Sequence, residues 1–330
     1  MLERACAFKY CDFSNTTMFW PLFKTIGTTS GTGFVAAQTV AEKGGEVVCL
    51  NRKSQRVEDA TKKLQEAVPN GKFVNIECDL QDFDSVNKAA EEVKSKYKSI
   101  YCLACNAGIS MTTDTATKDG CDNQMQTNHL SHFILAAKLF PLLEAEANNE
   151  GDARVVFHSS GARHMSENNQ LEKKYFEKNG GNLGGDGKSM FMGGGRIYRY
   201  AQSKLANSVT TYAMHEKLQA KGSKVRVICA HPGASATNIG NEMDLPWYEI
   251  LLFTVMLRTV FQSAEDGTMG LLTGMMVPDA QSGVLYGPLR MGSMNGPAVP
   301  NPPKPYENDS EAMKMLWETS EATTGVKFDI

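Results

Sequence analysis

The 330-residue sequence has no run rich in lysine or arginine, and its formal net charge is only -3. A nucleic-acid-binding surface needs clustered positive charge, so we expect no nucleic-acid partner. The first residues, MLERACAFKYCDFSNTT, lack the long apolar core of a signal peptide and carry acidic residues that transit peptides avoid. We therefore expect a cytoplasmic protein.

Long apolar runs are also missing. The most apolar one, LPWYEILLFTVML at 245–257, contains Glu249 and is shorter than the roughly 20 residues that a membrane-spanning helix needs. The segment fits an amphipathic lid over a substrate site. A peripheral membrane contact through the same face stays open as the alternative.

The eight cysteines are scattered along the chain, several of them inside apolar, strand-like runs. This arrangement is typical of reduced thiols and does not indicate a disulfide framework. Cys102 and Cys105 form a CxxC in YCLACNAG. A redox CxxC lies at a helix N-terminus, whereas this one ends a strand, so we interpret both as buried strand residues. The histidines show no metal-ligand spacing, so we predict no metal site and assign them no special role.

Short apolar segments alternate with amphipathic ones along most of the chain. The expected strands are GEVVCLNR, KFVNIECDL, SIYCLACNAG, ARVVFHSS, KVRVICAHPG and SGVLYGP. Helix-like segments lie between them, such as SQRVEDATKKLQEAV with Ser54 as its N-cap. This alternation builds βαβ units around a parallel sheet. We expect a single α/β domain over 19–330, a doubly wound Rossmann-type fold with a central parallel sheet of about seven strands.

Several segments fall outside this alternation. Residues 1–18 have no apolar periodicity and should be poorly ordered. The polar, glycine-rich stretch at 161–199 is longer than an ordinary loop, and we interpret it as a lid-like insertion. A substrate loop is expected at 240–262. The Pro-rich GPAVPNPPKPYENDS should be extended, and a closing helix should end at Gly325.

A glycine-rich turn, FKTIGTTSGTGF, occupies 23–34. Glycines permit the tight bend and let the backbone approach a pyrophosphate, while the N-terminus of the following helix favours negative charge. The spacing is GxxxGxG and not the better-known GxGxxG, so a plain turn is the alternative at this point.

The end of the second predicted strand bears on which dinucleotide would bind. An acidic residue there would bind the adenosine ribose of NAD and repel a 2′-phosphate. This sequence has Asn51 and Arg52 instead, and an arginine can pair with that phosphate. We therefore favour NADP(H) over NAD(H), with a solvent-facing Arg52 as the alternative.

Tyr200 and Lys204 are four residues apart in YAQSK and therefore share one helix face. A tyrosine is a poor acid or base at neutral pH because its ordinary pKa is about 10. A neighbouring ammonium stabilises the phenolate and lowers that pKa, so the pair can exchange a proton with a carbonyl or alcohol oxygen. By itself the YxxxK spacing is common by chance.

Further motifs stand where the carboxyl edge of the sheet is expected, which is where open α/β sheets bind ligands. They are CDL, NAG, NHLSHF, SS and HPG. With the glycine turn and YAQSK, this ordered set resembles the short-chain dehydrogenase/reductase family over 25–290. NHLSHF, YAQSKLAN and HPGASATN are similar to its retinol-dehydrogenase-like branch, which also includes the WW-domain oxidoreductases and relatives of protochlorophyllide reductase.

The resemblance implies a role for each matching position. The implied catalytic residues are Asn128, Ser160, Tyr200 and Lys204, with Ser159 as the alternative to Ser160. The implied cofactor-binding residues are Gly27, Thr29, Ser30, Gly31, Gly33, Asn51, Arg52, Asp79, Leu80, Asn106, Ala107, Gly108, Tyr200, Lys204, Pro232, Gly233 and Thr237.

Four of these residues would carry the chemistry that the resemblance implies. Ser160 would hydrogen-bond the substrate oxygen, and Tyr200 would be the acid/base. Lys204 would bind the nicotinamide ribose, and Asn128 would hold a distortion of its helix near that lysine. Hydride would move between NADP(H) and a carbonyl or alcohol carbon of a small hydrophobic substrate. The identity of the substrate and a homodimer both stay open.

The first strand departs from the family pattern. A central strand of a parallel sheet is buried on both faces and nearly all apolar, yet PLFKTI contains Pro21 and Lys24. A buried, unpaired ammonium is destabilised by several kcal/mol or loses its proton. One explanation is a catalytically weakened nucleotide-binding or scaffold protein. The other is a mis-assembled beginning to an ordinary enzyme, and the intact catalytic set favours an enzyme.

Overall fold

The computed structural model describes residues 23–189, 194–235, 248–249 and 262–330. Residues 1–18, Pro21 and most of the expected substrate loop at 240–262 lie outside the described residues, so the expectations for them stay predictions. Within the described residues, the strands form one sheet in the order β3-β2-β1-β4-β5-β6-β7-β8.

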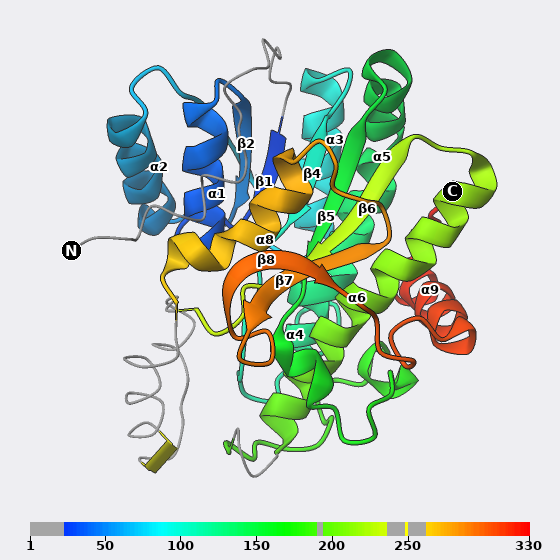
Figure 1. Ribbon diagram of the computed structural model, residues 1–330. Helices are drawn as coiled ribbons and strands as arrows, with labels where there is room; N and C mark the ends of the chain where they lie inside the picture. Colours follow the sequence, from blue (N-terminus) through cyan, green and yellow to red (C-terminus); the bar gives the residue numbers. More distant parts are fainter. Residues whose placement is uncertain (1–22, 190–193, 236–247, 250–261) are drawn as a thin grey trace.

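The sheet is parallel from β3 to β7, which confirms the expected doubly wound architecture (Figure 1). Its strands are β1 Phe23–Ile26, β2 Glu46–Asn51, β3 Lys72–Glu77, β4 Cys102–Cys105, β5 Ala153–His158, β6 Val225–Ala230, β7 Val284–Arg290 and β8 Asn295–Asn301. The last strand is antiparallel to β7 and comes from the Pro-rich segment expected only to be extended. The parallel part thus has the expected seven strands, and β8 adds an edge.

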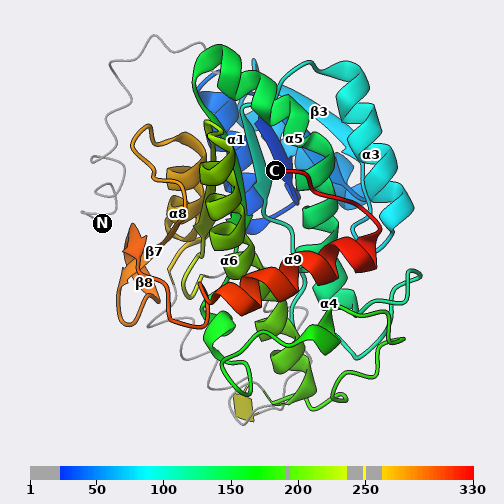
Figure 2. The same ribbon diagram turned by 90° about the vertical axis from the view of Figure 1, so that its right-hand side faces the viewer.

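Helices cover both faces of the sheet (Figures 1 and 2). One core packs α1 Gly31–Glu42, α2 Gln55–Ala67 and α8 Ala264–Met276 against the sheet. The opposite core packs α3 Phe83–Lys96, α5 Ser131–Glu150, α6 Gly195–Lys221 and α9 Ser310–Thr324. Of the helices that the structure describes, none combines the length and the apolarity that a bilayer-spanning segment requires.

Local signals fix where several elements begin and end. Ser54 precedes α2 as expected, although its side chain makes no capping hydrogen bond. Gly325 ends α9 in the left-handed conformation, with φ of 70°, as predicted. Cys102 and Cys105 are fully buried in β4, and burial raises the pKa of both thiols. Their interpretation as buried strand residues is confirmed.

The insertion after β5 is anchored to the body of the protein by a few buried side chains among its described residues. It contains two short 3₁₀ turns, Gly161–His164 and Lys173–Tyr175. Tyr175 and Phe176 are buried in the same core as α5, α6 and α9. Whether other parts of the insertion close over a substrate stays a prediction.

Candidate active site

The glycine turn joins β1 to α1 at the carboxyl edge of the sheet. Gly27 and Gly31 both have positive φ, 77° and 57°, which the turn requires and which side chains disfavour. Asn51, at the end of β2, braces this turn: its Oδ1 accepts from the Thr28 N–H at 3.1 Å, and its Nδ2 donates to Thr28 Oγ1 at 2.8 Å. The Asn51 side chain, expected to contact a cofactor, therefore has both polar atoms in use within the turn.

Gly33 has a packing role. A Cβ there would lie 1.9 Å from the Gly27 carbonyl oxygen and 2.5 Å from Asn106 Nδ2, so only glycine lets α1 meet the turn. Thr32 Oγ1 also donates to Asn106 Oδ1 at 2.9 Å. The third glycine of the motif thus shapes the turn, and its predicted contact with a cofactor stays a prediction.

A cleft of ≈ 270 Å³ runs along this edge of the sheet. The predicted cofactor residues that line it are Gly27, Thr29, Ser30, Gly31, Asn51, Arg52, Asp79, Leu80, Asn106, Ala107, Gly108, Tyr200, Lys204 and Pro232. Gly33 and Gly233 are not among the lining residues, and Thr237 lies outside the described residues. One continuous surface therefore brings together motifs from both halves of the fold.

Two arginines line the cleft at the turn. Arg52 follows β2, and Arg56 lies on the first turn of α2, where its Nη2 donates to Ser30 Oγ at 2.7 Å. Sequence reasoning identified Arg52 and missed Arg56. The available signal was its position, four residues after Arg52 at the beginning of a helix that starts at the cleft.

Tyr200 and Lys204 lie at the other end of the cleft. The Lys204 ammonium donates to the His158 carbonyl oxygen at 3.1 Å and lies 5.8 Å from the centre of the Tyr200 ring. Burial lowers the pKa of Lys204 to about 8. A Cβ on Gly108 would approach Lys204 Nζ to 3.0 Å. Glycine at 108 therefore leaves room for the lysine to reach the cleft.

The environment of the Tyr200 hydroxyl differs from the one expected. Burial raises its pKa above the ordinary value, while polar contacts with Ser160 and Ser110 act to lower it. The YxxxK spacing predicts instead a lowered pKa for Tyr200, because of the neighbouring ammonium. Desolvation of the phenol outweighs these contacts, so the protonated, proton-donating form of Tyr200 is favoured in this structure.

The two serines after β5 point to different partners. Ser159 is buried and its Oγ donates to the Lys204 carbonyl oxygen at 2.7 Å, so it ties the strand end to α6. Ser160 Oγ accepts from the Ala162 N–H at 3.2 Å and contacts Tyr200. Ser160 is thus the serine in contact with Tyr200, whereas Ser159 lines the cleft, and the choice of Ser160 as the catalytic serine stays a prediction.

Asn128 lies in the middle of a π-helical turn, Gln126–Leu130, that interrupts the long helix ending in α5. Its Oδ1 accepts from the Ile109 N–H at 2.8 Å, and its Nδ2 donates to the Ile109 carbonyl oxygen at 2.9 Å. The side chain therefore fixes the backbone after NAG, directly behind the cleft. The helix distortion has the place that the resemblance implied.

His158 is a site residue that sequence reasoning missed. It lines the cleft, and within the described part of the chain its buried Nε2 has no hydrogen-bond partner. Burial lowers its pKa to about 3, so the ring is neutral. Thr127 also lines the cleft with an Oγ1 that lacks a described partner. A histidine at the end of β5 was the only signal in the sequence.

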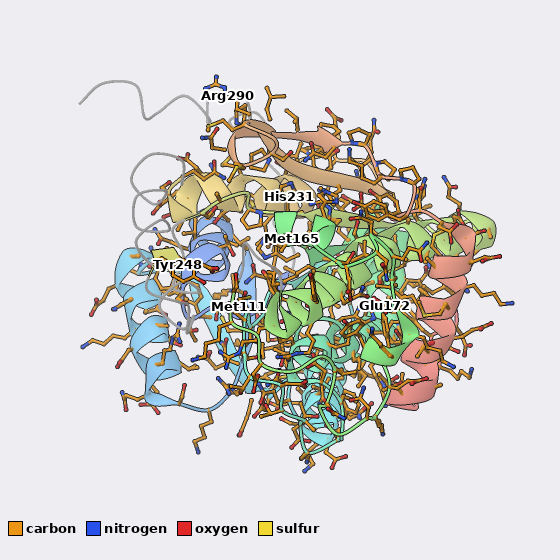
Figure 3. The ribbon with its side chains drawn as sticks, turned by 90° about the horizontal axis from the view of Figure 1, so that it is seen from below. Met111, Met165, Glu172, His231, Tyr248 and Arg290 are labelled. Atoms are coloured by element: carbon orange, nitrogen blue, oxygen red, sulfur yellow. The ribbon has the colours of Figure 1, made fainter. Side chains whose placement is uncertain are left out.

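Apolar side chains adjoin the acid/base pair. Met111 and Ile197 are buried against Tyr200, with Ala162 and Tyr198 packed beside them. Figure 3 views the molecule from this side, with Met111, Met165 and Tyr248 labelled. The two segments expected to wall a substrate pocket also touch, because Ser189 Oγ of the insertion donates to Glu249 of the second segment.

Comparison with known proteins gives a consistent result. A family model described as short chain dehydrogenase matches residues 25–171. The short chain dehydrogenase/reductase dpchH of Colletotrichum higginsianum is 28% identical over 308 residues, which cover 90% of this chain and 73% of the relative. Retinol dehydrogenase 14 of Mus musculus is 26% identical over 312 residues, which cover 91% of this chain and 84% of the relative.

Solved structures show the same fold. An uncharacterised protein from Mycobacterium Paratuberculosis has a TM-score of 0.71 and 27% identity, with 94% of this chain and 96% of that chain covered. An NADPH-bound carbonyl reductase from chicken fatty liver has a TM-score of 0.57 and 20% identity, with 81% of this chain and 96% of that chain covered. At this identity the second similarity speaks for the fold alone.

Proposed function

Because the chain belongs to the short-chain dehydrogenase/reductase family, we propose that it is an NADPH-dependent oxidoreductase that interconverts a carbonyl and an alcohol on a small hydrophobic substrate. The observation that carries the proposal is that Tyr200 and Lys204 line one end of the cleft while Ser160 contacts the Tyr200 hydroxyl. The comparisons support membership of the family, and the nicotinamide cofactor and the finer assignments below are part of the proposal.

The residues present fit a nicotinamide dinucleotide. The Gly27 turn and the N-terminus of α1 suit the pyrophosphate, and the Lys204 ammonium suits the nicotinamide ribose. His158 Nε2 and Thr127 Oγ1 are buried polar atoms that line the cleft without a described partner, as expected of groups that bind a ligand. When bound, the nicotinamide ring donates or accepts the hydride.

In the reducing direction, the Tyr200 hydroxyl donates its proton to the substrate oxygen as the carbonyl becomes an alcohol. Ser160, which contacts the same hydroxyl, holds that oxygen. The Lys204 ammonium stabilises the phenolate that remains until a solvent proton restores it. In the oxidising direction the same groups act in reverse. Asn128 contributes by fixing the backbone at Ile109.

The preference for NADPH is supported by the two arginines at the turn. Arg52 lines the cleft directly after β2, and Arg56 is held there by Ser30. Two guanidinium groups favour a phosphate on the adenosine ribose, which NADH lacks. The adjacent Asn51 is neutral and occupied by Thr28, so it supplies no opposing charge.

The hydrophobic substrate is supported by the apolar wall of Met111 and Ile197 beside Tyr200. A cytoplasmic location, which is a reducing environment, agrees with the cysteines, because those that the structure describes are free and buried.

The scaffold alternative rested on the unusual first strand. That strand nevertheless pairs in register with both β2 and β4, so the sheet carries the glycine turn in place and the enzyme is favoured.

The proposal is tested by titrating the protein with NADPH and with NADH while its fluorescence transfer to the nicotinamide is recorded. Carbonyl reduction is then followed by the loss of nicotinamide absorbance with decanal, benzaldehyde and all-trans-retinal as probes. We expect tighter binding of NADPH and turnover of at least one probe. Binding of neither nucleotide would support the scaffold alternative and exclude the enzyme.

A further inference from the structure

Glu307 is a buried carboxylate, far along the chain from the catalytic motifs, that lies between the loop after Ser160 and helix α6. Glu307 belongs to the segment between β8 and α9, and only 1% of it is exposed. Its Oε1 accepts from Arg163 Nε at 2.8 Å and from Ser208 Oγ at 2.7 Å. Its Oε2 accepts from the Lys304 N–H at 2.7 Å. Both carboxylate oxygens are therefore hydrogen-bonded.

The partners of Glu307 identify what it joins. Arg163 lies in the 3₁₀ turn that begins directly after Ser160, and its Nη1 donates to the Ser160 carbonyl oxygen at 3.0 Å. Ser208 lies on α6, four residues after Lys204 and eight after Tyr200, and therefore on the face that carries them. One carboxylate thus links the loop of the catalytic serine to the helix of the acid/base pair.

A second contact supports the same connection. His164 Nδ1 and the Tyr306 hydroxyl lie 2.6 Å apart, each the neighbour of a residue in the Arg163–Glu307 pair. Figure 2 shows the chain that leads into α9 passing alongside α6. Residues 304–307 therefore hold the loop at 160–164 next to α6 through two side-chain pairs, Arg163–Glu307 and His164–Tyr306.

We propose that Glu307 is a positioning residue, which through Arg163 and Ser208 fixes the Ser160 hydroxyl relative to the Tyr200 hydroxyl. The proposal rests on the proposed function, since it concerns the geometry of that catalytic pair. A buried ion pair contributes little net stability compared with apolar side chains of similar size, so its value here lies in geometry. A displacement of about 1 Å in a catalytic group can reduce turnover by up to roughly 100-fold.

The test compares Glu307→Gln with the parent in the full-length protein. We expect kcat for decanal with NADPH to fall about tenfold to 100-fold, while the affinity for NADPH stays within about twofold. Hydrogen–deuterium exchange should rise in peptides that cover 157–165 and stay unchanged in those that cover the glycine turn. Glu307→Asp, which keeps the carboxylate, should recover part of the lost kcat.

The matched control is Asp152→Asn, which breaks the ion pair with the buried Arg154 at the opposite edge of the sheet. It should lower the melting temperature without changing kcat per folded molecule. A double variant, Arg163→Met with Glu307→Leu, should regain stability but not kcat.

Three outcomes are informative. Parent-like kcat and exchange in Glu307→Gln would overturn the proposal, as would a double variant that regains full kcat. Absence of turnover by the parent itself would overturn the proposed function instead. In that case the exchange at 157–165 still decides whether Glu307 holds the serine loop.

Discussion

Two arginines at the amino edge of the sheet and the catalytic lysine at its carboxyl edge differ in how far the protein completes their hydrogen bonds. At the amino edge, Arg154 donates to Asp152 and to the carbonyl oxygens of Gly274 and Val277, while Arg226 bonds to Asp152, Pro278 and Ala280. At the carboxyl edge, the Lys204 ammonium has a single acceptor within the described residues, the His158 carbonyl oxygen.

The difference separates polar groups that the protein satisfies from groups that keep hydrogen-bonding capacity. The amino-edge arginines close off the end of α8 and its following turn, so their hydrogen bonds are completed by the protein. The carboxyl-edge groups, including His158 Nε2, line a cleft with hydrogen-bonding capacity to spare. The protein therefore satisfies Arg154 and Arg226 itself, whereas Lys204 and His158 keep hydrogen-bonding capacity at the cleft.

The largest effect at the carboxyl edge is expected for Tyr200→Phe. It removes the proton donor while keeping the buried ring, so we expect kcat to fall by about 10²–10⁴-fold with NADPH affinity retained. Steady-state kinetics and a fluorescence titration measure the two quantities. A variant that keeps more than about a tenth of the parent turnover, a loss under ~1.4 kcal/mol, would remove Tyr200 from its assigned role.

The amino edge should respond in stability alone. Asp152→Asn leaves the fully buried Arg154 without its carboxylate, so the free energy of unfolding should fall by about 3 kcal/mol. Chemical denaturation of the parent and the variant gives this number. Loss of turnover per folded molecule, without loss of stability, would show that the two edges are not separate in function.

Lys204→Met should show the reverse pattern, with activity lost and stability gained. The folded pKa of Lys204, about 8, lies below its ordinary 10.5, so the folded chain binds fewer protons than the unfolded chain between these values. Below pH 8 the parent must keep a buried ammonium charged, and the variant should be more stable by up to about 3 kcal/mol. This gain should disappear as the pH approaches 10.5.

The His158 carbonyl oxygen loses its Lys204 donor in this variant, but this loss does not offset the gain in stability. Asn207 Nδ2 also donates to the His158 carbonyl oxygen at 3.0 Å, so the oxygen stays hydrogen-bonded without the lysine. Denaturation curves at pH 7 and pH 10 distinguish the cases. A Lys204→Met protein that is less stable at pH 7 would mean that the ammonium is well solvated in the cleft.

Arg52→Ala should weaken NADPH binding by about tenfold to 100-fold, since a charge-assisted contact to the 2′-phosphate contributes roughly 1.5–3 kcal/mol. NADH binding should stay almost unchanged. Arg56→Ala is the companion variant, because Arg56 lies at the same end of the cleft. Equal losses for both nucleotides would assign the arginines a structural role.

The smallest expected effect concerns β1, a central strand of the sheet that runs from the amino edge to the carboxyl edge. Lys24 stands in register with Val48 and Leu103, both fully buried, while its own side chain lies outside what the structure describes. Lys24→Val should raise the free energy of unfolding by roughly 1–3 kcal/mol, because a charged side chain in an apolar part of the sheet destabilises the fold. A lower melting temperature for the variant would show that Lys24 has a partner.

The sequence predicted the sheet and the cleft because both depend on local patterns. Alternating strands and helices determine a parallel sheet, and motifs at strand ends necessarily meet at one edge. Tyr200 and Lys204 were found by their spacing on one helix. Asn128, Ser160 and the cofactor set came from the order of those motifs.

The parts that escaped prediction depend on contacts between distant segments or on context. Glu307 meets Arg163 across 144 positions, and neither residue belongs to a periodic pattern. His158 is one histidine among six, and only the fold shows that it lines the cleft. The direction of the Tyr200 pKa shift depends on how deeply α6 is buried, which the YxxxK spacing does not encode.

The antiparallel strand β8 has a consequence for how copies of this protein can associate. It forms the outer edge of the sheet beyond β7, and it contains Pro297 and Pro300, which have no N–H to donate. An exposed edge strand normally offers a template on which a second chain can extend the sheet. Pro297 and Pro300 are three residues apart and so face opposite sides of the strand, which leaves the free edge short of one donor. A continuous sheet across two β8 strands is therefore disfavoured.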